Sequence, residues 1–369
     1  MCAPGFPASS DDADKPFLLD HAKALVASGV IVSVIAPAVA GLPLRQTIDG
    51  VNIRRVRYGP QKMETLASTG SMYREARRLK SIMVIPMMIA LCVAMVSEAR
   101  KKSAVLYGHW WIPGGLVAVL AGSLTGRRSV VHLHGSDAAI TTNRVFKIIA
   151  RWVLRRAAVR LAVSDELANW GEELSGRKTD VLPMPLNFNR LAHPSPVPDQ
   201  GFVLAVGRLV PEKGFDVLLE AVGSIEAAFR PPVTIIGIGP ERENLVSQAR
   251  QLKVDLHLPG AISPNEMGEW YSRCRIVAVP SRREGFGLVA AEASAAGRTV
   301  VGTKVGGLPQ IIDHGVSGLL VEPGDSDALS KALLAADPAL GANGPNHVAK
   351  LQSDRHGECL RQLCEGLLV

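Results

Sequence analysis

The chain has 369 residues, of which 47% are hydrophobic and 20% are charged. These values exclude a disordered chain, and the length is that of two globular domains rather than one. The net charge of +7 is uneven: residues 1–195 hold 25 Lys and Arg against 14 Asp and Glu, and the remainder holds 16 against 20. The basic half fits an anionic lipid, an anionic substrate or a solvated surface. Aromatic residues are only 5%, and the absence of a nucleic-acid motif argues against a nucleic-acid partner.

The cysteines and the N-terminus indicate the compartment. The five cysteines are odd in number, scattered and without metal-binding spacing, which is typical of reduced thiols in a cytosolic protein. The N-terminal sequence MCAPGFPASSDDADK has neither the basic nor the apolar region of a secretory signal. We therefore expect a cytoplasmic protein, and the basic half predicts peripheral contact with the anionic inner face of a membrane.

In chain order, the first half alternates short apolar runs with amphipathic segments. Strands are predicted at 30–37, 51–58, 103–109, 129–135, 159–164 and 179–185. Helical patterns lie between them, such as FLLDHAKALVASG (17–29), which ends in glycine as helices often do. This alternation predicts a parallel sheet covered on both faces, in an N-terminal Rossmann-like domain of residues 1–190.

The run SIMVIPMMIALCVAMV (81–96) has to be tested as a membrane segment. It has sixteen residues, contains Pro86 and is flanked by basic sequence. A membrane-spanning helix needs about 20 apolar residues, so a span is disfavoured. The remaining interpretations are a helix buried in the core and a helix that contacts a membrane surface.

The second half repeats the α/β pattern. Residues 191–201 are rich in proline and lack periodicity, which predicts a linker. A second domain follows at 202–345, and residues 346–369 form a C-terminal helix expected to pack back on the N-terminal domain. Ligands bind beyond the carboxyl ends of strands in open parallel sheets, so we expect the site in a cleft between the two domains.

The segment SRREGFGLVAAEASAAG (281–297) leads from a strand into a helix. Its glycines permit a tight turn, and free N–H groups at the start of the following helix form an anion site; the residues concerned are Gly285, Gly287, Leu288 and Val289. Glu292 lies one turn further on, about 6 Å from the first helical residue. At that distance from a diphosphate, a carboxylate can accept hydrogen bonds from ribose hydroxyls. Glu284, before the helix, would face the group on the far phosphate.

Cations are supplied by the segment FVLAVGRLVPEKGF (202–215). Arg208 and Lys213 follow a predicted strand, and a guanidinium with an ammonium group suits two phosphates. The glycine-rich turns IIGIGPEREN (235–244) and GTKVGGLPQII (302–312) lie near the same strand ends, as ligand contacts or as turns only. The first lacks the full G-x-G-x-x-G pattern of dinucleotide sites.

Together these segments resemble the donor domain of family 4 retaining glycosyltransferases, which have the GT-B architecture. The resemblance extends over roughly residues 17–330 and rests on GRLVPEKG, IIGIGPERENL, HLPGAIS, VPSRREGFGLVAAEASAAG and VGGLPQIIDHGVSGLLVEPGD. It implies a nucleotide-diphospho-sugar donor, with the diphosphate on Arg208 and Lys213, the ribose on Glu292 and the sugar hydroxyls on Glu284. It also places Gly237 and Phe286 at the donor site, and the base at Pro259 and Gly260.

The first half carries the acceptor side. His134 ends a predicted strand in HLHGSD (132–137), a segment that resembles the family's acceptor-side motif, and His134 is therefore expected to be catalytic with Glu284. Asp137 would fix the local loop. His109 and Trp110 would line the acceptor pocket, although core packing explains the tryptophan equally well. The H-x-H pair has no visible third ligand, so it does not predict a metal site.

The chain also departs from the family pattern. It begins almost at the loop that usually follows the first strand, so that strand is expected to be missing. Pro185 and Asn187 stand where many members have glycine and aspartate. The D-x-D sequences in 11–14 and 325–327 are interpreted as a solvated turn and a helix cap. No metal and no cofactor is therefore predicted.

The sequence thus predicts a retaining, metal-independent hexosyltransferase that moves a sugar from a UDP- or GDP-sugar to a glycan or lipid-linked acceptor. The expected setting is polysaccharide or glycolipid synthesis. Two alternatives stay open: a sugar-nucleotide-binding protein that lost catalysis with its first strand, and a sugar-nucleotide epimerase of the same two-domain shape. The donor base, the sugar and the acceptor are not specified by the sequence.

Overall fold

The computed structural model describes residues 1–66, 82–101, 103–191, 197–198 and 201–368. The chain forms two compact units, which we call unit 1 (Met1–Pro185 with Ser353–Val369) and unit 2 (Leu186–Gln352). The sequence places the corresponding limits at 190 and 346. Most of the predicted linker 191–201 lies outside the described residues. No described helix is both long and apolar enough to cross a bilayer.

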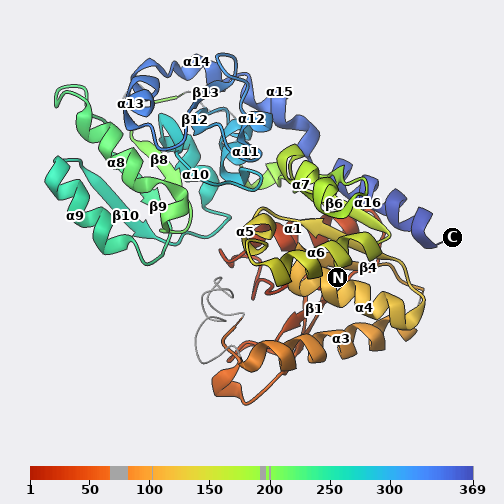
Figure 1. Cartoon of the computed structure of the whole chain (residues 1–369). Helices are drawn as coiled ribbons and strands as arrows, with labels where there is room; N and C mark the ends of the chain where they lie inside the picture. The colour runs from red at the N-terminus through yellow and green to blue at the C-terminus, as the bar shows by residue number, and fades with distance from the viewer. Residues whose placement is uncertain (67–81, 102, 192–196, 199–200, 369) are drawn as a thin grey trace. The chain divides into compact units, whose positions relative to one another are not determined.

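Unit 1 is an α/β unit built on parallel strands (Figure 1). Its strands are β1 (Ser33–Pro37), β2 (Arg45–Ile48), β3 (Val51–Val56), β4 (Leu106–His109), β5 (Ser129–Leu133), β6 (Val159–Ala162) and β7 (Asp180–Val181). Its helices are α1 (Pro16–Ala27), α3 (Val84–Lys101), α4 (Leu116–Thr125), α5 (Ser136–Ile140), α6 (Arg144–Arg156), α7 (Asp165–Ser175) and α16 (Ser353–Leu368), with short turns η1 (Gln61–Met63) and η3 (Trp110–Gly115). All six predicted strands are confirmed. Only the antiparallel β2 was missed, because its sequence RQTI is mostly polar.

A single residue joins the two parts of the unit 1 sheet. The strands run in the orders β1-β3-β2 and β4-β5-β6-β7. Cys2 lies between them and forms parallel bridges with Ile35 and Gly108. Its N–H donates to the Tyr107 carbonyl (2.7 Å), and its carbonyl accepts from the N–H of His109 (3.0 Å). Residues 1–3 therefore lie between the two parts of the sheet, at the place where the first strand was expected to be missing.

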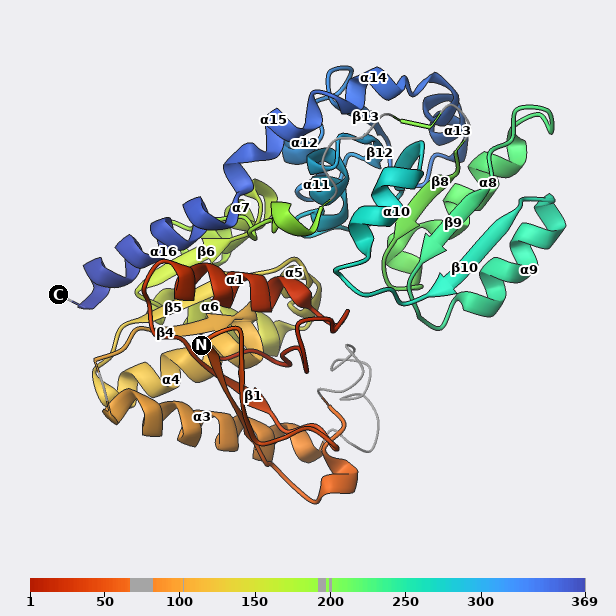
Figure 2. The ribbon, with the colours of Figure 1, turned by 180° about the vertical axis from the view of Figure 1, so that it is seen from behind.

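Helices cover both faces of this sheet. Neighbouring residues of a strand point to opposite faces, so one strand contributes apolar side chains to both. Val34 belongs to the apolar cluster with α1 and α16, and Ile35 belongs to the one with α3 and α4. Gly357 lets α16 approach α1 closely, since a Cβ there would lie 2.2 Å from the Ala24 carbonyl oxygen. Figure 2 shows α1 and α16 together on the face away from α3.

Unit 2 has a six-stranded parallel sheet of order β10-β9-β8-β11-β12-β13. The strands are β8 (Val203–Val206), β9 (Val233–Ile236), β10 (Leu256–Gly260), β11 (Ile276–Val279), β12 (Thr299–Thr303) and β13 (Gly318–Val321). The helices are α8 (Phe215–Ser224), α9 (Arg242–Leu252), α10 (Met267–Arg273), α11 (Leu288–Ala295), α12 (Leu308–Ile311), α13 (Ser326–Ala335), α14 (Pro338–Gly341) and α15 (Gly344–Val348), with turns η4 (Phe188–Arg190), η5 (Pro211–Lys213) and η6 (Ala349–Leu351). The strand order reverses between β8 and β11, which is the point where such sheets bind ligands.

Candidate functional site

The loops after β8 and β11 flank this reversal point and carry the predicted donor-site residues. Lys213 ends η5 on the first loop, and Glu284 lies on the second. The Lys213 Nζ donates to the Glu284 Oε2 at 2.7 Å. The Ser281 hydroxyl and the Gly285 N–H also donate to this carboxylate, at 3.3 and 3.2 Å. The two side chains remain 23% and 15% exposed, so the pair is sheltered but still reachable.

The electrostatics of this pair favour the ionised acid. Burial by itself raises the pKa of Glu284, but the charge of Lys213 and the three hydrogen bonds outweigh it and hold the pKa below its usual value. The carboxylate therefore stays charged at neutral pH. A charged pair at the carboxyl end of a parallel sheet can rearrange around a polar ligand.

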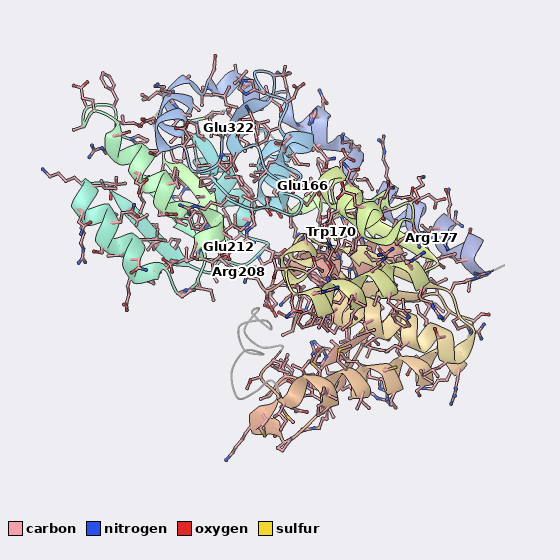
Figure 3. The ribbon with its side chains drawn as sticks, in the orientation of Figure 1. Glu166, Trp170, Arg177, Arg208, Glu212 and Glu322 are labelled. Carbon is pink, nitrogen blue, oxygen red and sulfur yellow. The ribbon has the colours of Figure 1, made fainter. Side chains whose placement is uncertain are left out.

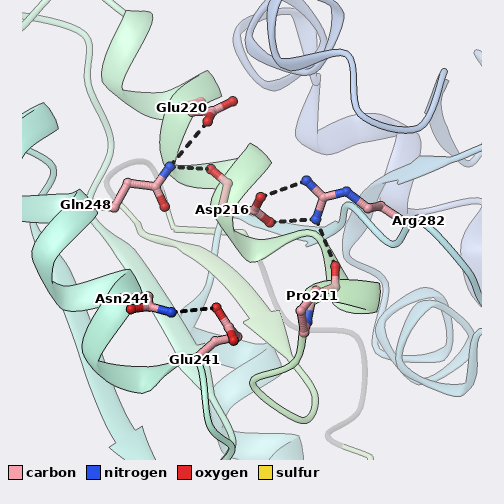
Figure 4. A network of polar contacts seen from close by, with 7 residues as sticks. All are labelled: Pro211, Asp216, Glu220, Glu241, Asn244, Gln248 and Arg282. Carbon is pink, nitrogen blue, oxygen red and sulfur yellow. Dashed lines mark hydrogen bonds and ion pairs between the residues drawn. The ribbon is translucent and has the colours of Figure 1, made fainter.

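A second ion pair fixes the two loops to each other. The Arg282 guanidinium binds both oxygens of Asp216 at 2.7 Å and donates to the Pro211 carbonyl at 2.8 Å, as Figure 4 shows. The Arg282 N–H also donates to the Glu212 carbonyl (2.8 Å). These contacts hold the Glu284 loop against η5, and they place Lys213 opposite the acid.

The turn after β12 supports the Glu284 loop from its other side. Gly306 has φ 56°, and a Cβ there would lie 1.8 Å from the Glu284 carbonyl oxygen. Only glycine fits at this contact. The Thr303 hydroxyl donates to the Ser281 carbonyl at 2.6 Å. The sequence left open whether segment 302–312 is a turn only or a ligand contact. In the structure it packs against the loop that carries Glu284 and supports it.

Helix α11 begins directly after this loop. Gly287 precedes it with φ 94°, which places the N–H groups of Leu288 and Val289 at the free end of the helix. Glu292 accepts a hydrogen bond from the Tyr271 hydroxyl at 2.8 Å. Tyr271 is fully buried, and burial followed by the charge of Glu292 raises its pKa well above its usual value, so it stays a donor. Tyr271 was not predicted as part of the site, because it belongs to α10, outside the segment 281–297.

The other predicted donor residues fall into two groups. Close packing defines the first group: Phe286 is only 6% exposed, and a Cβ on Gly237, which is itself partly exposed, would lie 1.8 Å from the Gly207 carbonyl oxygen. Accessible residues form the other group; they are Arg208, Pro259, Gly260 and Gly285. Figure 3 labels Arg208 beside Glu212 on the loop after β8. The accessible group can contact a ligand directly.

In unit 1, a hydrogen bond joins His134 to His109. The His109 Nδ1 and the His134 Nε2 are 2.8 Å apart, and one of them donates to the other. Asp137 accepts from the backbone N–H groups of His134 and Trp111. Burial raises the pKa of Asp137 to about 7, against the lowering effect of these hydrogen bonds. His109 and Asp137 are fully buried, so they lie behind His134 and do not themselves offer a surface to an acceptor.

Trp110 lies next to His134 and is partly exposed. Their ring centroids are 4.6 Å apart, and the Phe17 ring is 5.7 Å from that of His134. Trp110 has φ 60°, a left-handed conformation that costs energy in a residue other than glycine. The unit therefore holds this indole in place against local strain, and Trp110 with His134 forms the accessible part of the predicted acceptor side.

Five histidines gather in the core of unit 1: His21, His109, His132, His134 and His356. Burial lowers the pKa of each, to about 3 for His134 and about 4 for His356, so the cluster is neutral at neutral pH. This histidine cluster was not predicted from the sequence, because its members are far apart in the chain: His21 and His356, which share a hydrogen bond, are 335 positions apart.

Three of these imidazoles satisfy the spacing of a metal site. Ligand nitrogens of His109, His132 and His134 lie within 4.8 Å of one another. The sequence showed no third ligand beside His132 and His134, but the structure places one there: His109, on the neighbouring strand β4. His132, however, uses both nitrogens: its Nε2–H donates to the Leu182 carbonyl (2.8 Å) and its Nδ1 accepts from the Tyr107 hydroxyl (2.6 Å). A bound ion would have to break these bonds.

Two family models match the chain: the glycosyl transferase 4-like domain over residues 16–187 and the glycosyl transferases group 1 over residues 190–336. A glycosyltransferase of Methanocaldococcus jannaschii is 30% identical over 275 residues, 71% of this chain and 75% of the relative. The chain belongs to the group 1 glycosyl transferases and is a glycosyltransferase, which confirms the resemblance seen in the sequence.

A further relative and a solved structure support the family assignment and the fold. D-inositol 3-phosphate glycosyltransferase of Nocardioides sp. is 29% identical over 373 residues, 86% of this chain and 76% of the relative. Sucrose-phosphate synthase of Thermosynechococcus elongatus superposes with a TM-score of 0.79 at 21% identity, over 98% of this chain and 97% of that one. The structural likeness confirms the GT-B fold.

Proposed function

We propose that the protein transfers a hexosyl group from a nucleotide-diphospho-sugar to an acceptor hydroxyl with retained configuration. The observation that carries the proposal is the Lys213–Glu284 pair at the strand-order reversal of unit 2, beside the free end of α11. Cationic and N–H donors meet there at the end of a parallel sheet, which suits a diphosphate. The similar Anabaena protein HepE, whose structure has a TM-score of 0.75 to this chain at 18% identity, forms a complex with UDP-glucose.

In this proposal each accessible residue of unit 2 has one task. Lys213, Arg208 and the first N–H groups of α11 bind the diphosphate. Glu292, held by Tyr271, accepts hydrogen bonds from the ribose, and Glu284 accepts them from the sugar once Lys213 turns to the phosphate. Pro259 and Gly260, at the end of β10, contact the base.

On the acceptor side, neutral His134 and the indole of Trp110 orient the sugar and the acceptor hydroxyl. In this arrangement Glu284 is engaged with the sugar hydroxyls, so we assign retention to attack on the same face, with the donor phosphate taking the acceptor proton. The protein then contributes orientation and charge stabilisation. The proposed acceptor is a glycan or a lipid-linked molecule, in polysaccharide or glycolipid synthesis, at the cytoplasmic side of a membrane.

We further propose that transfer needs no metal and no cofactor. Lys213, Arg208 and the α11 N-terminus supply the positive charge that a divalent ion supplies elsewhere. The three-imidazole group described above is in unit 1, and its hydrogen bonds compete with coordination. Activity that survives prolonged treatment with EDTA would support this proposal, and activity restored only by an added ion would refute it.

The test of the whole proposal combines binding and turnover. A thermal-shift panel of UDP- and GDP-sugars identifies the donor, because a ligand of the folded state raises the melting temperature. Turnover with candidate acceptors follows, and proton NMR of the product gives the anomeric configuration. Retention is expected, and an inverted product would overturn the mechanism. Binding without any transfer would favour a catalytically impaired protein, and a changed donor without an acceptor would favour an epimerase.

A further inference from the structure

One face of unit 1 exposes rows of apolar side chains that glycosyl transfer does not use. Three helices, α3, α4 and α6, carry one row each, at the three- to four-residue spacing of one helix side. The row of α3 is Ile85, Ile89 and Val93, continued by Ile82 just before the helix, all exposed by 59–70%. The row of α4 is Leu120 and Leu124, exposed by 37% and 66%, and the row of α6 is Val145, Ile148 and Trp152, exposed by 38–62%. Contiguous exposed apolar residues of this number indicate an interaction surface.

Basic residues stand at the carboxyl end of each row. They are Arg100 and Lys101 on α3, Arg127 and Arg128 just after α4, and Arg155 and Arg156 on α6. The helix dipole favours cations at these ends, but it does not account for the apolar rows before them. The Arg156 guanidinium lies 5.6 Å from the ring centre of Trp152, which links the last apolar side chain of α6 to the charge.

The three basic ends lie side by side. Arg127 Nε donates to the Ala99 carbonyl near the end of α3 (3.4 Å). A shallow hollow between α4 and α6 is lined by Arg127, Arg128 and Arg156. Figure 1 shows the helices in the order α3, α4, α6 across the unit. The rows and their charges therefore form one surface, which we call the α3–α4–α6 face.

We propose that the α3–α4–α6 face binds the surface of an anionic lipid bilayer. The apolar rows enter the boundary between headgroups and acyl chains, and the arginines bind lipid phosphates. Trp152 suits this depth, because an indole places an apolar ring and a polar N–H at the interface. A nucleic acid would match the arginines but not the isoleucines, and a second copy of this chain would leave the clustered cations without partners.

This surface also connects to the acceptor side. The ring of Phe146 on α6 lies 6.2 Å from the ring of Trp111. The backbone N–H of Trp111 donates to the Asp137 carboxylate. Helix α6 thus contacts η3, which begins at Trp110. This step rests on the function proposed above. An enzyme bound to the membrane through this face would have its acceptor side near the lipid surface, so we infer a lipid-anchored acceptor.

Co-sedimentation of the full chain with vesicles tests the proposal without any substrate, so its failure is distinct from a failure of the proposed function. The protein should pellet with vesicles of phosphatidylcholine and phosphatidylglycerol, and far less with phosphatidylcholine alone. Arg156→Glu should weaken binding at least about fivefold, since each basic residue near an anionic surface contributes about that factor. Ile148→Ser should weaken it about tenfold through lost apolar burial.

Matched controls lie outside this face. Ile31→Ser changes an isoleucine that is 76% exposed on the loop after α1, and Arg250→Glu reverses an exposed charge on α9. Neither should alter vesicle binding. The proposal is overturned if anionic vesicles do not pellet the protein, or if the controls weaken binding as much as Ile148→Ser. It is also overturned if light scattering finds a dimer that Ile148→Ser converts to a monomer, or if RNA displaces the vesicles and binds the Ile148→Ser variant unchanged.

Discussion

The candidate-site side chains of the two units differ in charge: the Lys213–Glu284 pair of unit 2 is charged, and the clustered histidines of unit 1 are neutral. In unit 2, Lys213 lowers the pKa of Glu284 against the effect of burial, and the acid is charged. In unit 1, burial lowers the pKa of His134 to about 3 and of His356 to about 4, and these imidazoles are neutral. Unit 2 stabilises a charged acid by pairing it with a lysine, and unit 1 keeps its clustered imidazoles uncharged by burial.

This difference matches two kinds of ligand. In the proposed function, a diphosphate brings charge that must be met by existing cations, and unit 2 holds Lys213 on an acid whose place the diphosphate can take. A hydroxyl brings no charge, and a neutral imidazole can hydrogen-bond it without attracting a counter-ion. The comparison therefore predicts that charge deletions damage unit 2 most, whereas unit 1 is sensitive to hydrogen-bond geometry and to pH.

The largest effect is expected from Lys213→Met. It removes the cation from the proposed diphosphate site, and kcat/KM should fall by about a thousandfold, as for other lost electrostatic contacts at a reacting group. Glu284 is left sheltered without its partner, so the free energy of unfolding should drop by about 1–3 kcal/mol. Steady-state kinetics and urea unfolding measure the two effects.

Lys304→Met is the matched control in the same unit. Lys304 pairs with Glu322 at 2.8 Å, but both side chains are more than half exposed. Stability should change by less than about 0.5 kcal/mol and turnover should not change. Equal losses in both variants would mean that unit 2 is sensitive to any lost lysine, and the assigned role of Lys213 would fail.

A smaller effect is expected from His109→Leu in unit 1. His109 is buried and acts through its hydrogen bond to His134, which fixes the orientation and tautomer of that ring. Loss of such a supporting partner typically costs about 10–100-fold in related sites. We expect kcat to fall about tenfold with little change in KM for the donor, and His109→Gln, which can still hydrogen-bond His134, to restore most of it. A change in donor KM alone would contradict this positioning role.

Acid should destabilise unit 1 before it affects the Lys213–Glu284 pair. The unfolded chain binds protons at its histidines near pH 6.5, but folded His134 and His356 bind them only near pH 3 and 4. The unfolded state therefore holds more protons in that window, and stability falls as pH drops from 6.5 towards 4. Asp137 acts in the opposite direction: its pKa is raised to about 7, so the folded state binds the extra proton between pH 3.8 and 7.

His356→Asn tests this pH dependence. Urea midpoints measured between pH 7 and pH 4 should decline less steeply in the variant, by about 1–2 kcal/mol at the acid end. His257→Asn, at an exposed histidine on β10 of unit 2, should leave the decline unchanged. An identical slope in the His356 variant and the wild type would mean that the buried cluster is not the source of acid sensitivity.

Local motifs were sufficient for part of the donor site. Glu284, Gly287 and Glu292 occupy one strand–loop–helix segment, and the positions of the turn and helix follow from its glycines and its apolar run. The partners of these residues could not be predicted, because the fold alone brings them together. Tyr271 reaches Glu292 from another helix.

Unit 1 was less accessible to sequence reasoning for the same reason. The hydrogen bond between His21 and His356 spans almost the whole chain, and the bridge made by Cys2 depends on two strands that are distant in sequence. The motif HLHGSD identified His134, but its burial among other histidines, and hence its neutral state, requires the packed core. Periodicity also predicted the apolar segment of α3, but not which of its faces would be exposed.

The smallest expected effect, that of Arg282→Lys, separates charge from geometry in unit 2. Lysine keeps the positive charge opposite Asp216 but cannot form the planar, two-bond contact or reach the Pro211 carbonyl at the same time. Because the two side chains are 38% and 43% exposed, stability should change by less than about 1 kcal/mol. The looser loop would hold Glu284 less firmly, and kcat/KM should fall only about two- to threefold, because Lys213 still supplies its charge. If Arg282→Lys instead lowers kcat/KM as much as Lys213→Met, then unit 2 contributes loop geometry rather than the charge of Lys213. The two units would then differ less than the charge states of their side chains indicate.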